Sequence, residues 1–305
     1  MSGPDPELVA QCRQIMAHHA KSFDRAARFL PGRLRDPVAV LYAFCRTVDD
    51  TADTATDASD AQRELEAMRA ELDGARPPRP VIAALRSLTA EPLMLAAADA
   101  LVRGVMSDVG VVALADEAAL VRYAYAVAGS VGVLMCGVLG VQDPVALPFA
   151  IDLGIAMQLT NIARDVREDA LLGRVYLPGA ALARRGVASA DVVRGTAPRG
   201  AVAAVVLEVL ALADRYYASA DLGMRYLPDA ARPAILVASR LYQAIGTRIR
   251  GWGGDALRGR AIVPRSDKAW HIGRGLARAW TTSSDPVVHT RELHAPLVGC
   301  PGANA

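Results

Sequence analysis

Apolar residues recur at helical spacing along most of the 305-residue chain, and prolines and glycines interrupt the pattern. The periodicity predicts helices over residues 6–19, 37–54, 57–70, 81–109, 116–140, 149–171, 200–226 and 229–250. Asp5-Pro6 and Asp36-Pro37 each have the form of an N-cap followed by proline at the first helical position. No alternating apolar and polar run of strand length occurs, so the pattern predicts a single all-α domain.

Two of the predicted helices carry polar residues along the border of their apolar stripe. Over 37–54, the stripe consists of Val38, Leu41, Tyr42, Cys45 and Val48, and its border carries Arg46, Asp49 and Asp53. Over 149–171, the corresponding border positions are Gly154, Gln158, Asn161, Asp165 and Asp169. Polar groups turned toward a core cost free energy unless they serve a cavity. The acids therefore indicate a cavity rather than a solvated face.

The oxygen ligands on these two helices repeat every four residues, which places Asp49 and Asp53 on one face and stacks Asn161, Asp165 and Asp169 on the other helix. Crowded carboxylates repel one another, and a hard divalent cation removes that penalty. Mg²⁺ commonly takes one or two carboxylates together with substrate phosphates. Arginine beside such acids suits pyrophosphate, because its planar fork binds phosphate oxygens bidentately. The motifs predict one cavity in which Mg²⁺, or alternatively Mn²⁺, binds a diphosphate.

Composition narrows the class of protein further. The chain is 52% hydrophobic and only 5% aromatic, which favours helices over a β-sandwich, and its net charge of +2 gives no support to nucleic-acid binding. The four cysteines form no CxxC pair, and Cys45 and Cys136 fall in apolar helices as buried thiols. The N-terminus lacks a basic start followed by an apolar stretch, so a cytoplasmic location is expected.

Two segments test the picture of one soluble helical domain. Residues 123–141 carry no formal charge and are long enough to span a bilayer. Their four glycines and the nearby Arg122 and Asp143 favour a buried central helix instead. Residues 281–305 are polar and contain proline and glycine, so a disordered tail is expected. His289, His294 and Cys300 lie in this tail, where a structureless segment is favoured over a zinc site.

An ordered set of further motifs accompanies the two acidic helices. These motifs are His19-Ala20-Lys21-Ser22-Phe23, Leu41-Tyr42-Ala43-Phe44-Cys45-Arg46, Tyr123 with Val127-Ala128-Gly129-Ser130-Val131-Gly132, and Gly173-Arg174-Val175-Tyr176-Leu177-Pro178. With them, the chain resembles the squalene and phytoene synthase family of head-to-head isoprenoid synthases over nearly its whole length. It looks most like the bacterial phytoene synthases. One departure is Thr54, where many relatives carry another acid.

The resemblance implies an isoprenoid-synthase helical bundle around a central cavity, formed by residues 1–280. In the family, residues matching Asp49, Asp53, Asn161, Asp165 and Asp169 bind Mg²⁺ against two prenyl diphosphates. The resemblance also implies a set of diphosphate and substrate contacts, namely His19, Lys21, Ser22, Tyr42, Arg46, Tyr123, Gln158, Arg164, Tyr242 and Arg260, with Lys268 near Arg260. Catalytic roles fall to Asp49, Asp53, Asp165 and Asp169. Tyr42 and Tyr123 would either steady a cation or orient diphosphate, and the alternative for each is an ordinary core tyrosine.

The implied reaction is the Mg²⁺-dependent, head-to-head condensation of two geranylgeranyl diphosphates. It passes through a cyclopropylcarbinyl diphosphate (prephytoene diphosphate) to phytoene, the first committed step of carotenoid biosynthesis, and is expected to need no NADPH. Because the substrate and the product carry long hydrophobic chains, we expect the protein to associate peripherally with the inner face of the membrane. We also expect it to transfer its product to a carotenoid desaturase.

Three alternatives remain open. A relative using farnesyl diphosphate would make squalene, hydroxysqualene or dehydrosqualene, and an ionisation-type terpene cyclase would share the acids but not the whole motif set. A non-catalytic assembly or scaffold relative would be expected to lose acids, whereas all five oxygen ligands are present. The small residues of the central helix, Gly129, Ser130, Gly132 and Gly137, are expected to leave room for long prenyl chains.

Overall fold

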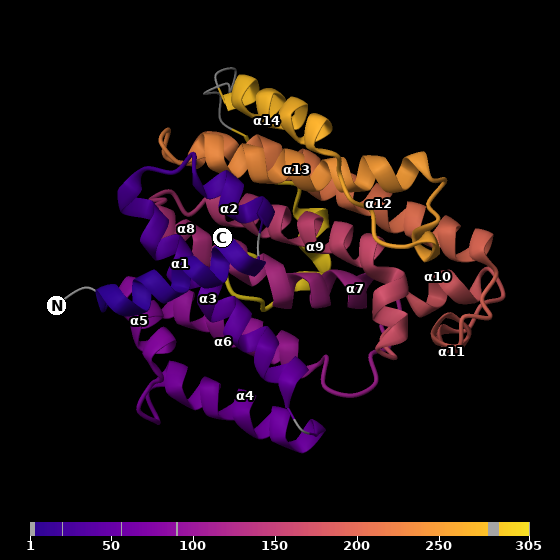
Figure 1. The fold of residues 1–305 in the computed structure, drawn as a ribbon, viewed down its shortest axis with the longest axis horizontal. Coiled ribbons are helices and arrows are strands. Elements are labelled where there is room, and N and C mark those ends of the chain that lie inside the picture. Colours follow the sequence, from indigo (N-terminus) through magenta and orange to yellow (C-terminus); the bar gives the residue numbers. More distant parts are fainter. Residues whose placement is uncertain (1–3, 20, 56, 90, 280–286, 305) are drawn as a thin grey trace.

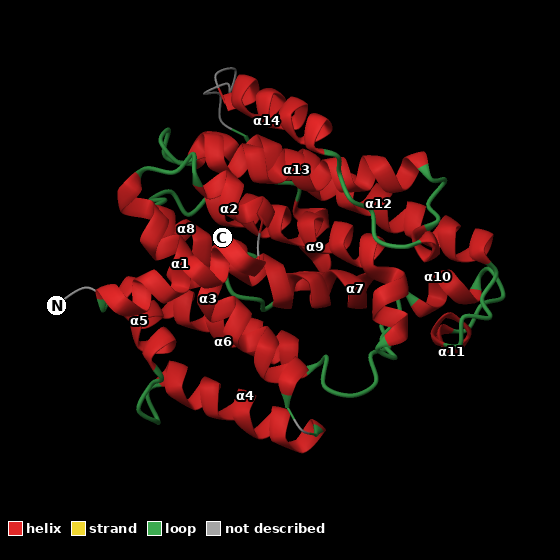
Figure 2. Ribbon diagram, viewed as in Figure 1, coloured by secondary structure: helices red, strands yellow, loops and turns green. Residues whose placement is uncertain are grey.

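The computed structural model describes residues 4–19, 21–55, 57–89, 91–279 and 287–304 as a bundle of helices (Figure 1). Within that part of the chain the elements are helices and loops without a strand (Figure 2), apart from one isolated bridge between Ala113 and Val175. The all-α fold is confirmed.

The first half contains α1 (Pro6–His19), α2 (Lys21–Ala27), α3 (Gly32–Thr54), α4 (Ala58–Asp73), α5 (Pro80–Leu88), α6 (Pro92–Met106), α7 (Glu117–Ala124), the π-helical turn η1 (Tyr125–Gly129) and α8 (Ser130–Leu139). The second half contains α9 (Ala146–Leu171), α10 (Gly179–Ala183), α11 (Ser189–Val193), α12 (Arg199–Gly223), η2 (Met224–Tyr226), α13 (Arg232–Gly251), η3 (Ala256–Arg258), α14 (Arg265–Ala279) and η4 (Arg291–Leu297).

Helix α9 runs through the middle of the bundle and packs against α8 and η1 on one side and α12 and α13 on the other. Its stripe residues Ile151, Ile155 and Leu159 are fully buried, as the periodicity predicts. Helix α14 covers the outer side of α13, and α4 lies outside α6 (Figure 1). The arrangement surrounds α9 and so fixes the face that carries Gln158, Asn161, Asp165 and Asp169.

Helix α3 starts earlier than the sequence suggested. It begins at Gly32 and contains Pro37, so the interpretation of Asp36 as an N-cap is wrong. Asp36 instead accepts a hydrogen bond from Arg13 Nε on α1 at 2.6 Å. Arg35 donates to the carbonyl of Leu30 at 3.0 Å across the first turn. The partner of Asp36 therefore comes from another helix, and no local sequence signal reveals that contact.

The apolar segment 123–141 and the middle helix α9 both meet the length and hydropathy of a membrane span. The two runs are Glu117–Leu139 and Ala146–Leu171, and their most apolar windows are 50% and 72% buried inside the protein. Both are core helices of the bundle. The π-helical turn at η1 interrupts the first run directly after Tyr123 and Ala124.

Two glycines set the spacing between η1–α8 and α9. A Cβ added at Gly132 would lie 2.2 Å from the carbonyl oxygen of Ala150, and one added at Gly154 would lie 2.2 Å from that of Ala128. Backbone therefore packs on backbone at this crossing. The expectation that Gly132 makes room for prenyl chains is wrong, because its missing side chain is replaced by the neighbouring helix.

Gly132→Ala and Gly154→Ala are each expected to lower the free energy of unfolding by about 3 kcal/mol or more, since the helices must move apart to admit the methyl group. Gly200→Ala is the matched control, because Gly200 is an exposed residue of α12 and no atom in the described part of the chain lies within 4 Å of an added Cβ. Urea unfolding measures all three. Two crossing variants as stable as the native chain would contradict the packing described here.

The C-terminal segment is ordered against the bundle. Leu293 and Leu297 are buried, Tyr216 on α12 donates to the carbonyl of Leu293 at 2.8 Å, and Tyr125 donates to that of Pro301 at 2.7 Å. The prediction of a disordered tail over 281–305 is therefore wrong for residues 287–304, and residues 280–286 and 305 lie outside the described part of the chain. The segment forms a short 3₁₀ helix with a proline inside it, which has no α-helical periodicity to detect.

Candidate active site

A cavity of about 600 Å³ opens between α3 and α9, and residues from well-separated segments line it. Asp49 and Asp53 come from α3, while Asn161, Asp165 and Asp169 come from α9. The cavity also brings together most of the substrate contacts expected from the sequence, namely His19, Tyr42, Arg46, Tyr123, Gln158, Arg164, Tyr242 and Arg260. Lys21 and Ser22 begin α2, but their side chains and that of Lys268 lie outside the described part of the structure.

The carboxyl groups repel one another inside this cavity. Burial raises the pKa of Asp49 to about 7, and Asp53 adds to the rise while Arg46 opposes it. Burial also raises the pKa of Asp169 to about 7, with a further contribution from Asp165. Although Asp49 faces the open cavity, protein atoms surround its carboxyl group closely enough to disfavour the charge. The site favours a compensating positive charge beside these two acids.

The donor set fits a hard divalent cation. All five candidate ligands offer oxygen, and the side-chain oxygen Oδ1 of Asn161 is buried without a hydrogen-bond partner among the residues that the structure describes. An acceptor held in that state costs free energy unless something binds it. Oxygen ligands from carboxylates and an amide match Mg²⁺ and Mn²⁺ better than softer metals.

Arginines alternate with the acids around the cavity. Arg164 donates from Nε to Asp165 at 2.7 Å, Arg260 approaches the same carboxylate at 3.1 Å, and Arg174 lies 3.3 Å from Asp53. The lining holds five carboxyl groups (Asp49, Asp53, Asp108, Asp165, Asp169) and four guanidinium groups (Arg46, Arg164, Arg174, Arg260). Divalent cations at the acids would make this lining strongly positive, which suits a polyanionic ligand such as diphosphate.

Comparison with known proteins shows which family the chain belongs to. The family model for squalene/phytoene synthase matches residues 16–267. The chain belongs to the squalene/phytoene synthase family. That match spans both acidic helices and almost the whole cavity lining, and it confirms the family resemblance drawn from the motifs.

Several curated members of the squalene/phytoene synthase family are similar along most of their length. The 15-cis-phytoene synthase of a Paracoccus species is 38% identical over 286 residues, covering 88% of this chain and 91% of that protein. The phytoene synthase of Cereibacter sphaeroides is 36% identical over 298 residues, covering 93% of this chain and 83% of that protein.

Two solved structures have a similar fold. A dehydrosqualene synthase in complex with a ligand matches with a TM-score of 0.79 at 27% identity, covering 90% of this chain and 96% of that one. A squalene synthase from Alicyclobacillus acidocaldarius matches with a TM-score of 0.70 at 24% identity, over 80% of this chain and 94% of its own, and supports the fold alone.

Sequence reasoning missed three polar residues of this synthase-family cavity. Asp108, in the loop after α6, accepts hydrogen bonds at 2.9 Å from the hydroxyls of both Tyr123 and Tyr176. Burial raises the pKa of Asp108 to about 6 despite these hydrogen bonds. Arg174 and Tyr176 belong to the Gly173–Pro178 motif and were available as a signal, whereas Asp108 is a lone loop acid without any motif.

Aromatic residues also line the cavity, among the polar groups. The rings of Tyr123 and Tyr176 stack with their centroids 4.9 Å apart, and the ring centroids of Phe23 and Tyr242 are 5.5 Å apart. Ala52, Val105 and Ile162 add aliphatic surface to the same cavity. The cavity therefore combines charged groups with aromatic and aliphatic surface, as an amphipathic ligand requires.

Proposed function

We propose that this chain condenses two molecules of geranylgeranyl diphosphate head to head and converts the cyclopropylcarbinyl diphosphate so formed into phytoene. The observation that carries the proposal is the meeting of both acidic motifs and four arginines in one cavity whose lining also includes aromatic and aliphatic residues. Relatives at 36–38% identity over most of their length carry the names phytoene synthase and 15-cis-phytoene synthase, which supports the choice of substrate. This prenyltransferase reaction would be the first committed step of carotenoid biosynthesis.

Mg²⁺, or Mn²⁺ in its place, would be held by Asp49 and Asp53 from one side and by Asn161, Asp165 and Asp169 from the other. When bound, the metal neutralises the diphosphate and lowers the barrier to breaking the allylic carbon–oxygen bond. Arg164 and Arg260 meet at Asp165, where diphosphate oxygens would take over their hydrogen bonds. These arginines therefore bind and orient the leaving group.

The remaining lining residues would contact the prenyl chains of the substrates. Phe23, Val105 and Ile162 provide apolar surface that keeps water from an allylic cation, which attacks the double bond of the second prenyl chain. The hydroxyl protons of Tyr123 and Tyr176 are both directed at Asp108, so only oxygen lone pairs and ring faces remain for other partners. We propose that Tyr123 steadies the cation rather than grips the diphosphate, because diphosphate oxygens would require that proton.

The runner-up is the condensation of farnesyl diphosphate to a C30 hydrocarbon. It is favoured by the similarity to a dehydrosqualene synthase structure at a TM-score of 0.79. Both reactions share the cavity and the first half-reaction, so they differ in the prenyl length accepted. We propose that phytoene formation needs neither NADPH nor another reductant, because its second half-reaction ends in the loss of a proton.

Product mass separates these candidates. Purified protein with Mg²⁺ is expected to convert geranylgeranyl diphosphate to a C40 hydrocarbon of phytoene mass, equally well with and without NADPH. Excess EDTA is expected to abolish turnover, and added Mg²⁺ to restore it, because the ligands are hard oxygens. A C30 hydrocarbon made only from farnesyl diphosphate would overturn the substrate assignment, and full activity in EDTA would overturn the metal assignment.

We also propose that the protein works in the cytoplasm and associates peripherally with the membrane, where it would pass phytoene to a desaturase. The support is the burial of both long apolar helices within the bundle, together with the insolubility of a C40 hydrocarbon. Washing membranes with salt or carbonate would then release the protein without detergent.

A further inference from the structure

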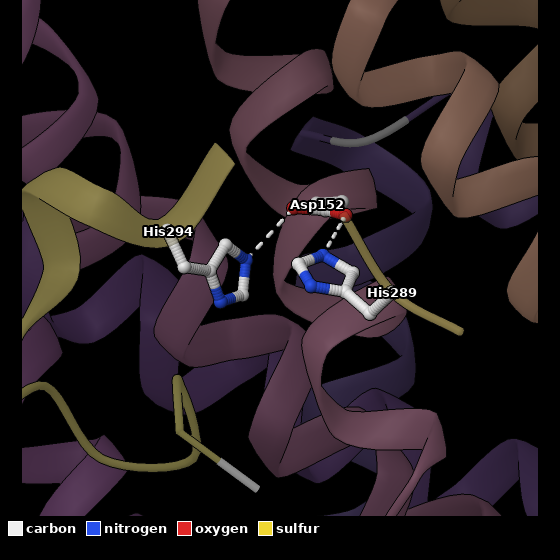
Figure 3. Close-up of side chains that lie close together, drawn as sticks. All are labelled: Asp152, His289 and His294. Atoms are coloured by element: carbon white, nitrogen blue, oxygen red, sulfur yellow. Dashed lines mark hydrogen bonds and ion pairs between the residues drawn. The ribbon is translucent and has the colours of Figure 1, made fainter. Parts of the chain in front are cut away.

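A carboxylate and two imidazoles meet inside the protein, apart from the residues that line the cavity. Asp152 projects from α9, and His289 and His294 reach it from the C-terminal segment (Figure 3). His289 Nε2 lies 2.8 Å from Asp152 Oδ2, and His294 Nε2 lies 2.9 Å from Oδ1. The Asp152 side chain is completely buried and that of His294 is 4% exposed. Neither the cation-binding proposal nor the substrate-binding proposal uses this cluster.

The surroundings of His294 fix its protonation. One ring nitrogen, Nδ1, faces the carbonyl oxygen of Ala303 at 2.8 Å, and the other, Nε2, faces the Asp152 carboxylate. A carbonyl oxygen accepts hydrogen bonds and cannot donate them, and the same is true of an ionised carboxylate. Both ring nitrogens of His294 must therefore carry a proton, which makes the side chain a buried imidazolium.

Asp152 is arranged as the matching anion. It accepts hydrogen bonds from His289 and His294, and the hydroxyl of Ser219 on α12 donates to its Oδ2. Burial raises the pKa of Asp152, but the hydrogen bonds from the two histidines and from Ser219, together with the charge of His294, outweigh it and the net shift is downward. Burial likewise lowers the pKa of His294, and Asp152 reverses that to a net rise. The two shifts describe one ion pair with its hydrogen bonds satisfied.

The remaining titratable groups nearby bind the segment without competing for the pair. Tyr216 on α12 and Tyr125 in η1 donate to the carbonyls of Leu293 and Pro301. Cys300 is half-buried, and the charge of Arg122 on α7 acts on its thiol. His289 contributes a hydrogen bond between its Nε2 and Asp152.

Hydrogen-bond geometry favours protons over a metal ion in this cluster. The two nitrogen–oxygen separations of 2.8 and 2.9 Å are ordinary hydrogen-bond lengths. Ligands about 2.0–2.2 Å from a tetrahedral zinc ion lie roughly 3.3 Å from one another, so an ion would have to spread the three side chains apart.

We propose that Asp152 and His294 form a charged clasp that docks residues 287–304 as a strap onto α9. The strap holds the same helix that presents Asn161, Asp165 and Asp169 to the cavity. Breaking a buried pair leaves one uncompensated charge, so the clasp makes docking all-or-none.

The clasp has a defined pH dependence. His294, with its raised pKa, contributes stability that is complete below its unfolded value of about 6.5 and is lost as pH rises through the folded value. Asp152, with its lowered pKa, contributes stability that is complete above about 3.9 and is lost as pH falls through its folded value. The strap is therefore expected to loosen as the solution becomes alkaline.

The direct test is ¹⁵N NMR of histidine-labelled full-length protein. One buried histidine should show both ring nitrogens protonated at neutral pH, and this signature should vanish in Asp152→Asn. Trypsin provides a second measurement, because Arg291 lies within the strap and can be cut only when the strap undocks. Asp152→Asn and His294→Gln should each speed cleavage after Arg291 about tenfold or more. His18→Gln, a change at an exposed histidine of α1, should leave the rate unaltered.

Three results would overturn the clasp. The first is a singly protonated His294 in the native protein, which would place the shared proton on Asp152. The second is stoichiometric zinc or another transition metal in purified protein that slows cleavage after Arg291 and is lost in Asp152→Asn. The third is a cleavage rate in both clasp variants equal to that of the His18→Gln control. The NMR arm uses native protein, so it decides the question even where a variant fails to fold.

Discussion

Asp49→Asn and Asp169→Asn are expected to abolish turnover while the protein stays folded and, in the absence of divalent cations, becomes no less stable to heat. Burial and neighbouring acids raise the pKa of both groups to about 7. Because this is above the unfolded value of about 3.9, ionisation opposes folding increasingly as pH rises from 4 towards 7. An amide removes that opposition. Losing one ligand of a metal that stabilises the leaving group is expected to lower kcat about a thousandfold or more.

Asp165→Asn separates catalytic from structural effects at the same site. It should lower turnover equally but also reduce thermal stability, since Arg164 and Arg260 both pair with this carboxylate. Glu208→Gln on α12 is the control for losing a carboxylate, because Glu208 pairs with Arg184 and Arg185 away from the cavity. Phytoene formation and thermal melts in EDTA measure both effects. Activity within a few-fold of the native protein in Asp49→Asn would refute the metal role of α3.

Asp108→Asn is expected to lower kcat about a hundredfold with little change in KM, and to release the cyclopropylcarbinyl diphosphate as a side product. The native carboxylate directs the hydroxyl protons of Tyr123 and Tyr176 toward itself. An amide can accept from only one side, so one hydroxyl would turn its proton toward the cavity and away from the geometry that suits a cation. Removing one oriented group of this kind typically costs two to three orders of magnitude, roughly.

Whether Asp108→Asn changes kcat or KM tests the proposal that Tyr123 stabilises the cation rather than binds diphosphate. If the tyrosines grip diphosphate, the Asp108→Asn variant should raise KM and leave the ratio of intermediate to hydrocarbon unchanged. Tyr176→Phe is the matched control, because it removes one hydroxyl and keeps the ring stacked 4.9 Å from that of Tyr123. A milder loss than in Asp108→Asn is expected for it, since Tyr123 keeps its hydrogen bond to Asp108.

The acids of α3 and α9 could be predicted from the sequence because a ligand every four residues is a property of one helix. The residues that local spacing cannot reveal lie in loops or depend on contacts between distant segments. Asp108 joins the cavity only because the loop after α6 packs beside Tyr123 and Tyr176. The strap escaped detection for the same reason, since its order comes from Asp152 and Tyr216, both far away in the chain.

The early start of α3 and the close crossing at Gly132 have a related cause. A proline after an acid is a good local signal for a helix start, but the contact between Arg13 and Asp36 uses the acid differently. Glycines in an apolar helix fit a cavity wall and a helix crossing equally well, and only the position of the Ala150 carbonyl distinguishes the two.

The close helix crossing at Gly132 and Gly154 also restricts the positions at which a mutation can change the chain length of the product. A larger side chain there meets backbone, so selection would remove such variants as misfolded before substrate choice was ever tested. Ala52, Val105 and Ile162 instead line the cavity, where, under the proposed function, added side-chain volume would occlude prenyl carbons. A mutational library aimed at C30 or C40 preference should therefore vary these three positions and hold both glycines constant.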